Sequence, residues 1–267
     1  IDFEDKSTRN VFGNYIDVYD IEQSVADGRT VRIYYESRLA ELKMNKDILP
    51  HIDEDFEEVT EGEEDKQTIK TKWAQLEKIV GSEPRINEIA QDIVDHFEKR
   101  LHTIDGKAMI VCMSRRICIE LHNAIKKIRP KWYHKDDEKG FMKIIMTGSA
   151  ADGSKWQEHI RDKRRRKALG EHFKKSESPF KLAIVRDMWL TGFDVPSLHT
   201  LYIDKPMKGH TLMQAIARAN RVYKDKQGGL IVDYLGIAQE LKKALSNYTK
   251  SGGAGTPTID QSAAIAH

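Results

Sequence analysis

The sequence has 267 residues, of which 39% are hydrophobic and 32% are charged, and its mean hydropathy is −0.60. It contains no run of about 18 apolar residues and opens with no signal peptide, which argues against a membrane or secreted protein and predicts a cytoplasmic location. The formal net charge of +2 is too small to indicate a nucleic-acid partner by itself. The two cysteines, Cys112 and Cys118, lie in an apolar segment, which favours buried thiols over a disulfide or a metal site.

The first hundred residues predict a crossing segment, an acidic loop and a helix. Residues 1–20 mix polar and aromatic side chains, and residues 30–35 (TVRIYY) then have the composition of a strand. Residues 53–65 carry nine carboxylates among thirteen residues, which predicts a solvated loop because their spacing matches no EF-hand. Residues 82–101 predict a helix, with Ser82 as its N-cap and an apolar stripe along one face.

A strand followed by a helix is predicted over residues 107–128. The apolar run KAMIVCM (107–113) is typical of a buried strand, and Ser114 can cap the helix that begins with Arg115. Both residues would lie at the carboxyl end of the strand and at a helix N-terminus, where open α/β sheets bind ligands and phosphate. A plain helix cap and a surface arginine are the alternative interpretation.

The next predicted strand covers residues 141–146 (FMKIIM). The segment that follows this strand resembles a phosphate-binding loop but does not match the P-loop pattern. A P-loop requires G-x-x-x-x-G-K-[ST], and in GSAADGSK (148–155) the lysine is displaced by one position. The sequence contains no other Walker A pattern and no DEAD/DExH box, and we predict no metal site in it. The chain is therefore expected to lack a phosphate loop of its own.

Positive charge is concentrated in residues 155–175, where residues 163–167 (KRRRK) are consecutive cations. Such a run predicts an exposed helix or loop, on which Arg164 and Arg165 are candidates for contact with DNA phosphates. A merely solvated charge run is the alternative. No base-reading module is visible, so any contacts are expected to be independent of DNA sequence.

The region from residue 180 to residue 234 carries the most informative pattern. Three short apolar runs have strand length and β-branched content, at residues 182–185, 201–203 and 230–232. A helix is predicted over residues 211–223, and its turn of 3.6 residues places three polar side chains on one face, Gln214, Arg218 and Arg221. Two guanidinium groups on a rigid element predict an anion site.

Two motifs in this region resemble those of superfamily 2 helicases and translocases. QAIARANR (214–221) resembles motif VI, whose pattern is roughly Q-x-x-[GA]-R-x-x-R, and residues 185–206 (VRDMWLTGFDVPSLHTLYIDKP) resemble motif V. The sequences of the two motifs are most similar to those of the motor (restriction) subunit of type I restriction enzymes. In that subunit an IVxDMxLTGFDxP segment precedes Q-x-I-[AG]-R-x-N-R at similar spacing. The resemblance is strong over about residues 105–245, and residues 107–128 resemble motif IV.

The resemblance implies a second RecA-like lobe, which is a three-layer α/β/α domain with a mostly parallel sheet. It divides the chain into four segments. Residues 1–36 would link from a missing first motor lobe, and residues 37–104 would hold the acidic insertion and a helix. The lobe itself would occupy residues 105–250, and residues 251–267 would form a flexible tail toward a following domain.

Motif VI implies that Arg218 and Arg221 are arginine fingers for ATP hydrolysis, and that Gln214 couples them to water or to the opposite lobe. Motif V implies that Gly192 and Asp194 reach the nucleotide. Ordinary salt bridges for the arginines, and a turn carboxylate for Asp194, are the alternatives.

The same resemblance implies DNA contacts at the carboxyl edge of the sheet. In motif V the loop that contains Arg186 and Thr191 would contact a DNA phosphate, and Ser114 and Arg115 of motif IV would do the same. This chain departs from many relatives, which have a threonine where Arg186 stands, so the geometry of that contact would differ.

For the parent protein, the resemblance implies an ATP-dependent type I site-specific deoxyribonuclease and translocase. Its cofactors would be ATP and Mg²⁺, with metal ligands mainly from the missing first lobe. Its partners would be double-stranded DNA, methyltransferase and specificity subunits, and a nuclease domain in the same parent chain. The isolated chain is predicted to be inactive. The alternatives are the second lobe of another superfamily 2 helicase or remodeller, and a non-catalytic DNA-binding module.

Overall fold

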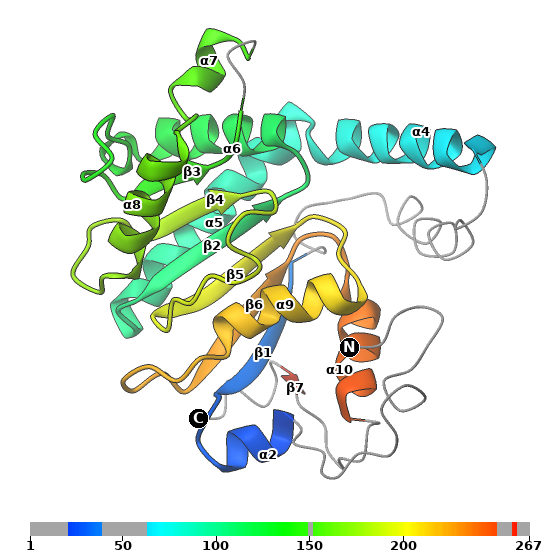
Figure 1. Cartoon of the computed structure of the whole chain (residues 1–267), viewed down its shortest axis with the longest axis vertical. Coiled ribbons are helices and arrows are strands. Elements are labelled where there is room, and N and C mark those ends of the chain that lie inside the picture. The colour runs from blue at the N-terminus through cyan, green and yellow to red at the C-terminus, as the bar shows by residue number, and fades with distance from the viewer. Residues whose placement is uncertain (1–20, 39–62, 149–151, 250–257, 261–267) are drawn as a thin grey trace.

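The computed structural model describes residues 21–38, 63–148, 152–249 and 258–260 (Figure 1). Residues 1–20, most of the acidic run, part of the segment 148–155 and the tail at 251–257 lie outside these ranges. No described helix combines the length and apolar character that a membrane crossing requires.

Seven strands form one sheet in the described part of the chain, and every pairing between them is parallel. Their order across the sheet is β3-β4-β2-β5-β6-β1-β7 (Figure 1). The strands are β1 (Arg32–Ser37), β2 (Lys107–Cys112), β3 (Met142–Ile145), β4 (Leu182–Val185), β5 (Leu198–Asp204), β6 (Gly228–Asp233) and β7 (Thr258–Asp260). This confirms the prediction of a mostly parallel sheet.

Helices cover both faces of the sheet (Figure 1). One face is covered by α5 (Glu83–Thr103), α6 (Arg115–Ile128) and the end of α4 (Glu63–Val80). The other face is covered by α8 (Lys163–Lys174), α9 (Gly209–Ala219) and α10 (Ala238–Thr249). Short helices are α2 (Ile21–Ala26), α7 (Ser154–Gln157) and a 3-10 turn (Pro130–Trp132). The three-layer α/β/α arrangement that the sequence predicts is therefore confirmed.

The central strands are apolar throughout because both of their faces are covered. In β2, Ile110 joins the core beneath α5 and α6, whereas its neighbours Met109 and Val111 join the core beneath α8 and α9. Both cysteines are free and buried, as predicted. Continuous burial explains why these strands were recognisable from short apolar runs alone.

Two elements that the sequence analysis places ahead of the lobe are built into it. Strand β1 pairs with β6 along its whole length, from Arg32 opposite Gly228 to Ser37 opposite Asp233. Helix α5 contributes Ile93 and Phe97 to the core on its side of the sheet. The α/β unit therefore uses chain from both sides of the segment that carries the acidic run.

Candidate functional site

The connection between β4 and β5 carries motif V from one end of the sheet to the other. Both strands pair in parallel with β2, so the chain leaves β4 at the carboxyl edge and enters β5 at the amino edge. Arg186 follows β4 directly and lies at the carboxyl edge, whereas Asp194 and Pro196 shortly precede β5. The predicted site residues are thus divided between two ends of the sheet.

Near the amino edge, α9 presents Arg218 to the motif V connection. The Arg218 Nη1 donates to the carbonyl oxygen of Phe193 at 2.8 Å, and its Nε donates to the carbonyl of Gln214 at 3.2 Å. Helix α9 lies directly on β6 because Gly229 leaves room for it: a Cβ at that position would stand 2.3 Å from the Ala219 carbonyl oxygen. The position of Arg218 is therefore set by the packing of a rigid element.

Arg221 reaches the same place from outside the helix. Its Nε lies 3.3 Å from Asp194 Oδ1, and both side chains are about half exposed. Helix α9 ends at Ala219, so the prediction of one helix through residue 223 was wrong, and Arg221 does not share a helical face with Arg218. The reason is a distant contact: the backbone N–H of Val31 donates to the Asn220 carbonyl at 2.8 Å, and Arg221 forms a β-bridge with Thr30.

The electrostatics of this group favour a polyanion. Burial lowers the pKa of Arg218 from its ordinary value, the neighbouring Arg221 lowers it further, and Asp194 opposes the change. Two guanidinium groups beside one exposed carboxylate leave an excess of positive charge, and planar guanidinium forks suit phosphate oxygens. We call Asp194, Arg218 and Arg221 the arginine face.

Two further predicted residues lie close to the arginine face. Gln214 stands one turn before Arg218 on α9, and its side-chain amide contacts His210 Nε2. Gly192 has a φ of 67°, a left-handed conformation that favours glycine, so the tight turn predicted in motif V is present.

An aromatic stack that was not predicted from the sequence supports the motif V connection. The Trp189 and Phe193 rings stack with centroids 4.2 Å apart, and Phe173 of α8 lies 5.4 Å from Trp189. Gly170 of α8 makes room, since a Cβ there would lie 3.1 Å from the Phe193 ring. Two aromatic residues flanking a Thr-Gly turn, in the sequence WLTGF, were the available signal. The stack holds the Phe193 carbonyl where Arg218 meets it.

At the carboxyl edge, Ser114 and Arg115 already have partners within the protein. The Ser114 hydroxyl oxygen accepts from the backbone N–H of Ile117 at 3.3 Å, so it is the N-cap of α6. Arg115 donates to both carboxylate oxygens of Asp152, at 3.0 and 3.2 Å, and lies 4.7 Å over the Trp156 ring. These bonds match the alternative interpretation of a cap and a surface arginine, and they fix where both groups point.

The other candidates for DNA contact lie on the motif V connection. Arg186 is half exposed, with its Nε 3.2 Å from Asp187 Oδ2, and Asp187 also pairs with Lys205 at the end of β5. Thr191 is exposed further along the same connection.

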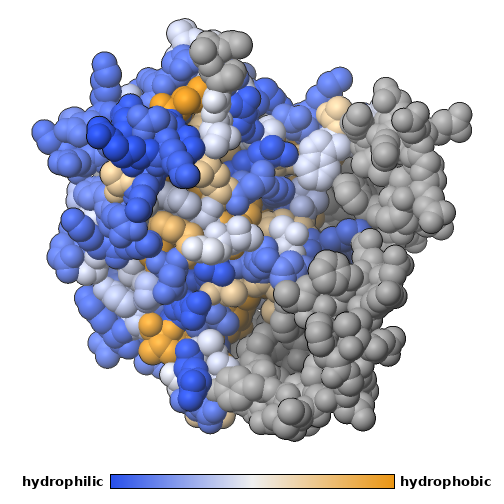
Figure 2. Space-filling view, in the orientation of Figure 1, coloured by the Kyte–Doolittle hydropathy of each residue, from blue (hydrophilic) through white to orange (hydrophobic). Residues whose placement is uncertain are grey.

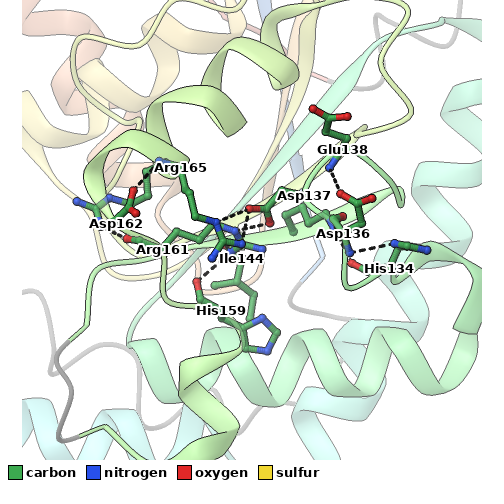
Figure 3. A network of polar contacts seen from close by, with 11 residues as sticks. His134, Asp136, Asp137, Glu138, Ile144, His159, Arg161, Asp162 and Arg165 are labelled. Atoms are coloured by element: carbon green, nitrogen blue, oxygen red, sulfur yellow. Dashed lines mark hydrogen bonds and ion pairs between the residues drawn. The ribbon is translucent and has the colours of Figure 1, made fainter.

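The basic run forms the first turns of α8, which confirms an exposed helix. Asp162 caps this helix by accepting from the backbone N–H of Arg165 at 2.7 Å. Arg161 and Arg165 both bind Asp137, at 2.6 and 2.7 Å (Figure 3). Burial by itself would raise the pKa of Asp137, but its bonds to the two arginines hold that pKa below its usual value. Arg164 is exposed, and hydrophilic side chains gather on this face of the molecule over α8 (Figure 2).

Comparison with known proteins places these features in a family. A family model described as type I restriction enzyme subunit R domain 3 matches residues 134–236, and a model described as SWI2/SNF2 ATPase matches residues 1–69. The chain is 45% identical over 258 residues to the type I restriction enzyme HindI endonuclease subunit of Haemophilus influenzae, covering 96% of this chain and 24% of the relative. It is 47% identical over 251 residues to the putative type I restriction enzyme MjaIXP endonuclease subunit of Methanocaldococcus jannaschii, covering 93% of this chain and 23% of the relative.

Two solved structures share the fold. A fragment of a putative HsdR subunit of a type I restriction enzyme from Vibrio vulnificus has a TM-score of 0.58 at 16% identity, covering 95% of this chain and 41% of that one. The ATP-dependent Type ISP restriction-modification enzyme LlaBIII bound to DNA has a TM-score of 0.50 at 10% identity, covering 95% of this chain and 17% of that one. The family predicted from motifs V and VI is confirmed, and the chain spans about a quarter of the length of the curated relatives that it matches.

Proposed function

We propose, from the homology of this chain with a segment of type I restriction enzyme endonuclease subunits, that it is the second RecA-like lobe of an ATP-driven translocase of double-stranded DNA. The parent would be an ATP-dependent type I site-specific deoxyribonuclease in the cytoplasm. It would act with methyltransferase and specificity subunits and with a nuclease domain in the same parent chain. The observation that carries the proposal is the arginine face, where Arg218 and Arg221 converge beside Asp194 from two different elements.

In this proposal ATP lies between the arginine face and a first motor lobe. Hydrolysis places negative charge on the γ-phosphoryl oxygens in the transition state, and an arginine finger there contributes roughly 10³ to 10⁵ in rate in related phosphoryl-transfer systems. Gln214 would couple the fingers to water or to the first lobe. Gly192 would let the backbone approach the nucleotide, and Asp194 would reach its ribose or orient the fingers.

The arginine face suits phosphate rather than metal ions. It contains two cations and one exposed carboxylate, whereas Mg²⁺ is usually bound through carboxylates and substrate phosphates. In the described part of the chain, no group of three or more His, Cys, Asp or Glu residues could hold a metal ion. We propose that the Mg²⁺ that accompanies ATP takes its protein ligands mainly from the first lobe, which would also supply the phosphate loop.

The proposed segments follow from this arrangement. Residues 1–36 would link from the first lobe, residues 37–104 would hold the acidic insertion and α5, residues 105–250 would form most of the lobe, and residues 251–267 would lead toward the next domain. Because β1 and α5 belong to the sheet and its core, the lobe would be completed by chain from the first two segments.

DNA would contact the carboxyl edge and α8 through its phosphates. Ser114 accepts its cap bond through the hydroxyl oxygen, so its O–H remains able to donate to a phosphate. Arg186, Thr191 and Arg164 are exposed for the same purpose. Arg115, Arg165 and Arg186 would have to exchange a carboxylate partner for a phosphate, because each already pairs with an aspartate.

Because Arg165 is paired with an aspartate and Arg164 is exposed, the two residues are predicted to contribute differently to DNA binding. In the full-length subunit, Arg164→Ala is expected to lower the slope of log affinity for DNA against log salt concentration by about 1, the value for one lost phosphate contact. Arg165→Ala is expected to change that slope less, because Asp137 competes for its guanidinium. Salt titrations of DNA binding measure both slopes. Equal slopes for the wild type and Arg164→Ala would remove α8 from the proposed DNA path.

The assignment of a second lobe predicts that two lobes are needed for hydrolysis. We expect the chain alone to show no ATP hydrolysis above background, with or without DNA, and the full-length subunit with DNA and its partner subunits to hydrolyse ATP rapidly. A phosphate-release assay compares the two, with Arg218→Ala as the control for contaminating ATPases. Turnover by the chain alone that Arg218→Ala abolishes would overturn the assignment.

A further inference from the structure

A buried lysine bonds to the backbone of the motif V connection and to the backbone of the residue Arg221. Lys226 lies just before β6, is 6% exposed, and directs its Nζ toward three backbone carbonyl oxygens. It donates to Leu198 at 2.7 Å, to Arg221 at 2.9 Å and to Pro196 at 3.4 Å. Pro196 ends the motif V connection and Arg221 follows α9, so one ammonium group holds the backbones of both motifs together.

The burial of Lys226 is expected to lower the stability of the folded state. Burying a cation without a counter-ion disfavours the folded state, and within the described residues no carboxylate forms an ion pair with Lys226. The charged and titratable groups that face it are cationic or neutral: Arg100 of α5 and His199 of β5. Burial lowers the pKa of Lys226 to about 7, and Arg100 acts in the same direction. Its ammonium group donates to three backbone carbonyl oxygens, which an apolar residue would leave without this donor.

We propose that Lys226 is a positioning residue for Arg221. Its ammonium group fixes the Arg221 backbone against the end of motif V, so that the guanidinium reaches Asp194 and, in the assembled motor, the nucleotide. The inference rests on the proposed function of the arginine face. It adds a residue outside both motifs, at the turn where the chain returns to the sheet.

The test is Lys226→Met in the full-length subunit, assembled with its partner subunits and DNA. Methionine keeps the length of the side chain and removes its donors. We expect the kcat for ATP hydrolysis to fall about 10- to 100-fold, the scale of a displaced catalytic group, with little change in KM. An unchanged kcat would overturn the inference.

A second buried lysine provides the matched control. Lys107 opens β2, is 0% exposed, and donates to the Phe180 carbonyl at 2.7 Å. Burial lowers its pKa to about 7, as for Lys226, and its Nζ lies 4.9 Å over the Phe173 ring. Its backbone pairs with the start of β5, which the substitution leaves in place, and its side-chain hydrogen bond goes to Phe180, outside motifs V and VI. Lys107→Met therefore removes an equally buried charge, and it is expected to leave kcat within about threefold of the wild type. An equal fall for both variants would show a general loss of stability and overturn the positioning role.

A double-mutant cycle separates positioning from stability. If Lys226 acts through Arg221, then Lys226→Met is expected to lower kcat no further once Arg221→Ala is present. Independent, multiplying losses would overturn the inference. Should Lys226→Met fail to fold, Lys226→Gln, which keeps one donor, goes through the same cycle with the same criterion. Failure of the proposed function looks different, because Arg221→Ala would then leave kcat unchanged by itself.

Discussion

Alanine in place of Arg218 or Arg221 is expected to lower ATP turnover by the full-length subunit at least a hundredfold while DNA affinity is retained. The reason is geometric. Arg218 is held by the packing of α9 on β6 and by the Phe193 carbonyl, and Arg221 is held beside Asp194 by its β-bridge with Thr30. Each guanidinium thus projects from fixed backbone at the proposed cleft, where loss of a finger removes transition-state stabilisation.

A neighbouring cation controls for loss of charge alone. Lys224 follows Arg221 by three residues and is exposed, and it forms no part of the arginine face. We expect Lys224→Ala to leave ATP turnover within about threefold of the wild type, and filter-binding or anisotropy measurements should show similar DNA affinity for all three variants. Undiminished turnover in both arginine variants would mean that motif VI has a structural role, and the non-catalytic DNA-binding module would then become the better interpretation.

The largest effect on stability is expected at Arg85, which joins α5 to the end of β5. Its Nη2 lies 2.6 Å from Asp204 Oδ1 and its Nη1 lies 3.2 Å from Asp204 Oδ2, with both residues buried. The guanidinium also donates to the Val80 and Tyr234 carbonyls. Arg85→Ala would leave the Asp204 carboxylate buried without its cation, so we expect a loss of about 3–5 kcal/mol in the free energy of unfolding.

An exposed pair of the same geometry provides the comparison. Arg129, at the end of α6, makes two bonds of 2.7 Å to Glu98 of α5, but this pair lies in contact with solvent. Arg129→Ala is expected to change stability little, because exposed pairs gain little from their charges. Urea denaturation of the chain measures both variants. Similar midpoints for Arg85→Ala and the wild type would contradict the assignment of the buried pair.

The sequence predicted the sheet well because its central strands are buried on both faces. Runs such as LAIV in β4 and MKII in β3 are short, largely apolar and rich in β-branched residues, so they need no alternating pattern to be recognised. Helix α5 was equally visible from its apolar stripe, and α6 from its cap residue Ser114. In these elements the local pattern and the final burial agree.

The errors and omissions arise where contacts between distant residues decide the structure. Helix α9 stops at Ala219 because the chain near Thr30, almost two hundred positions earlier, pairs with the residues that follow it. The three carbonyl partners of Lys226 likewise come together only in the folded sheet. Motif VI pointed to Arg218 and Arg221, but a helical projection could not show that these two residues converge from two different elements.

The partners of the basic residues could also not be predicted from the sequence. A run of cations indicates an anion, but it cannot show which members an aspartate from the same chain already holds. Asp137 holds Arg161 and Arg165, and Asp152 holds Arg115. We therefore propose Arg164 ahead of them as a candidate for contact with DNA phosphates.

Arg218 and Arg221 are proposed to stabilise the transition state of ATP hydrolysis. The most direct test is the affinity of the full-length subunit, with its partners and DNA, for ADP with aluminium fluoride, compared with its affinity for ADP alone. We predict that Arg218→Ala and Arg221→Ala change the affinity for ADP only a few fold and weaken binding of the transition-state analogue at least a hundredfold. Equal changes for the two ligands, or no change for either, would contradict the assignment of arginine fingers.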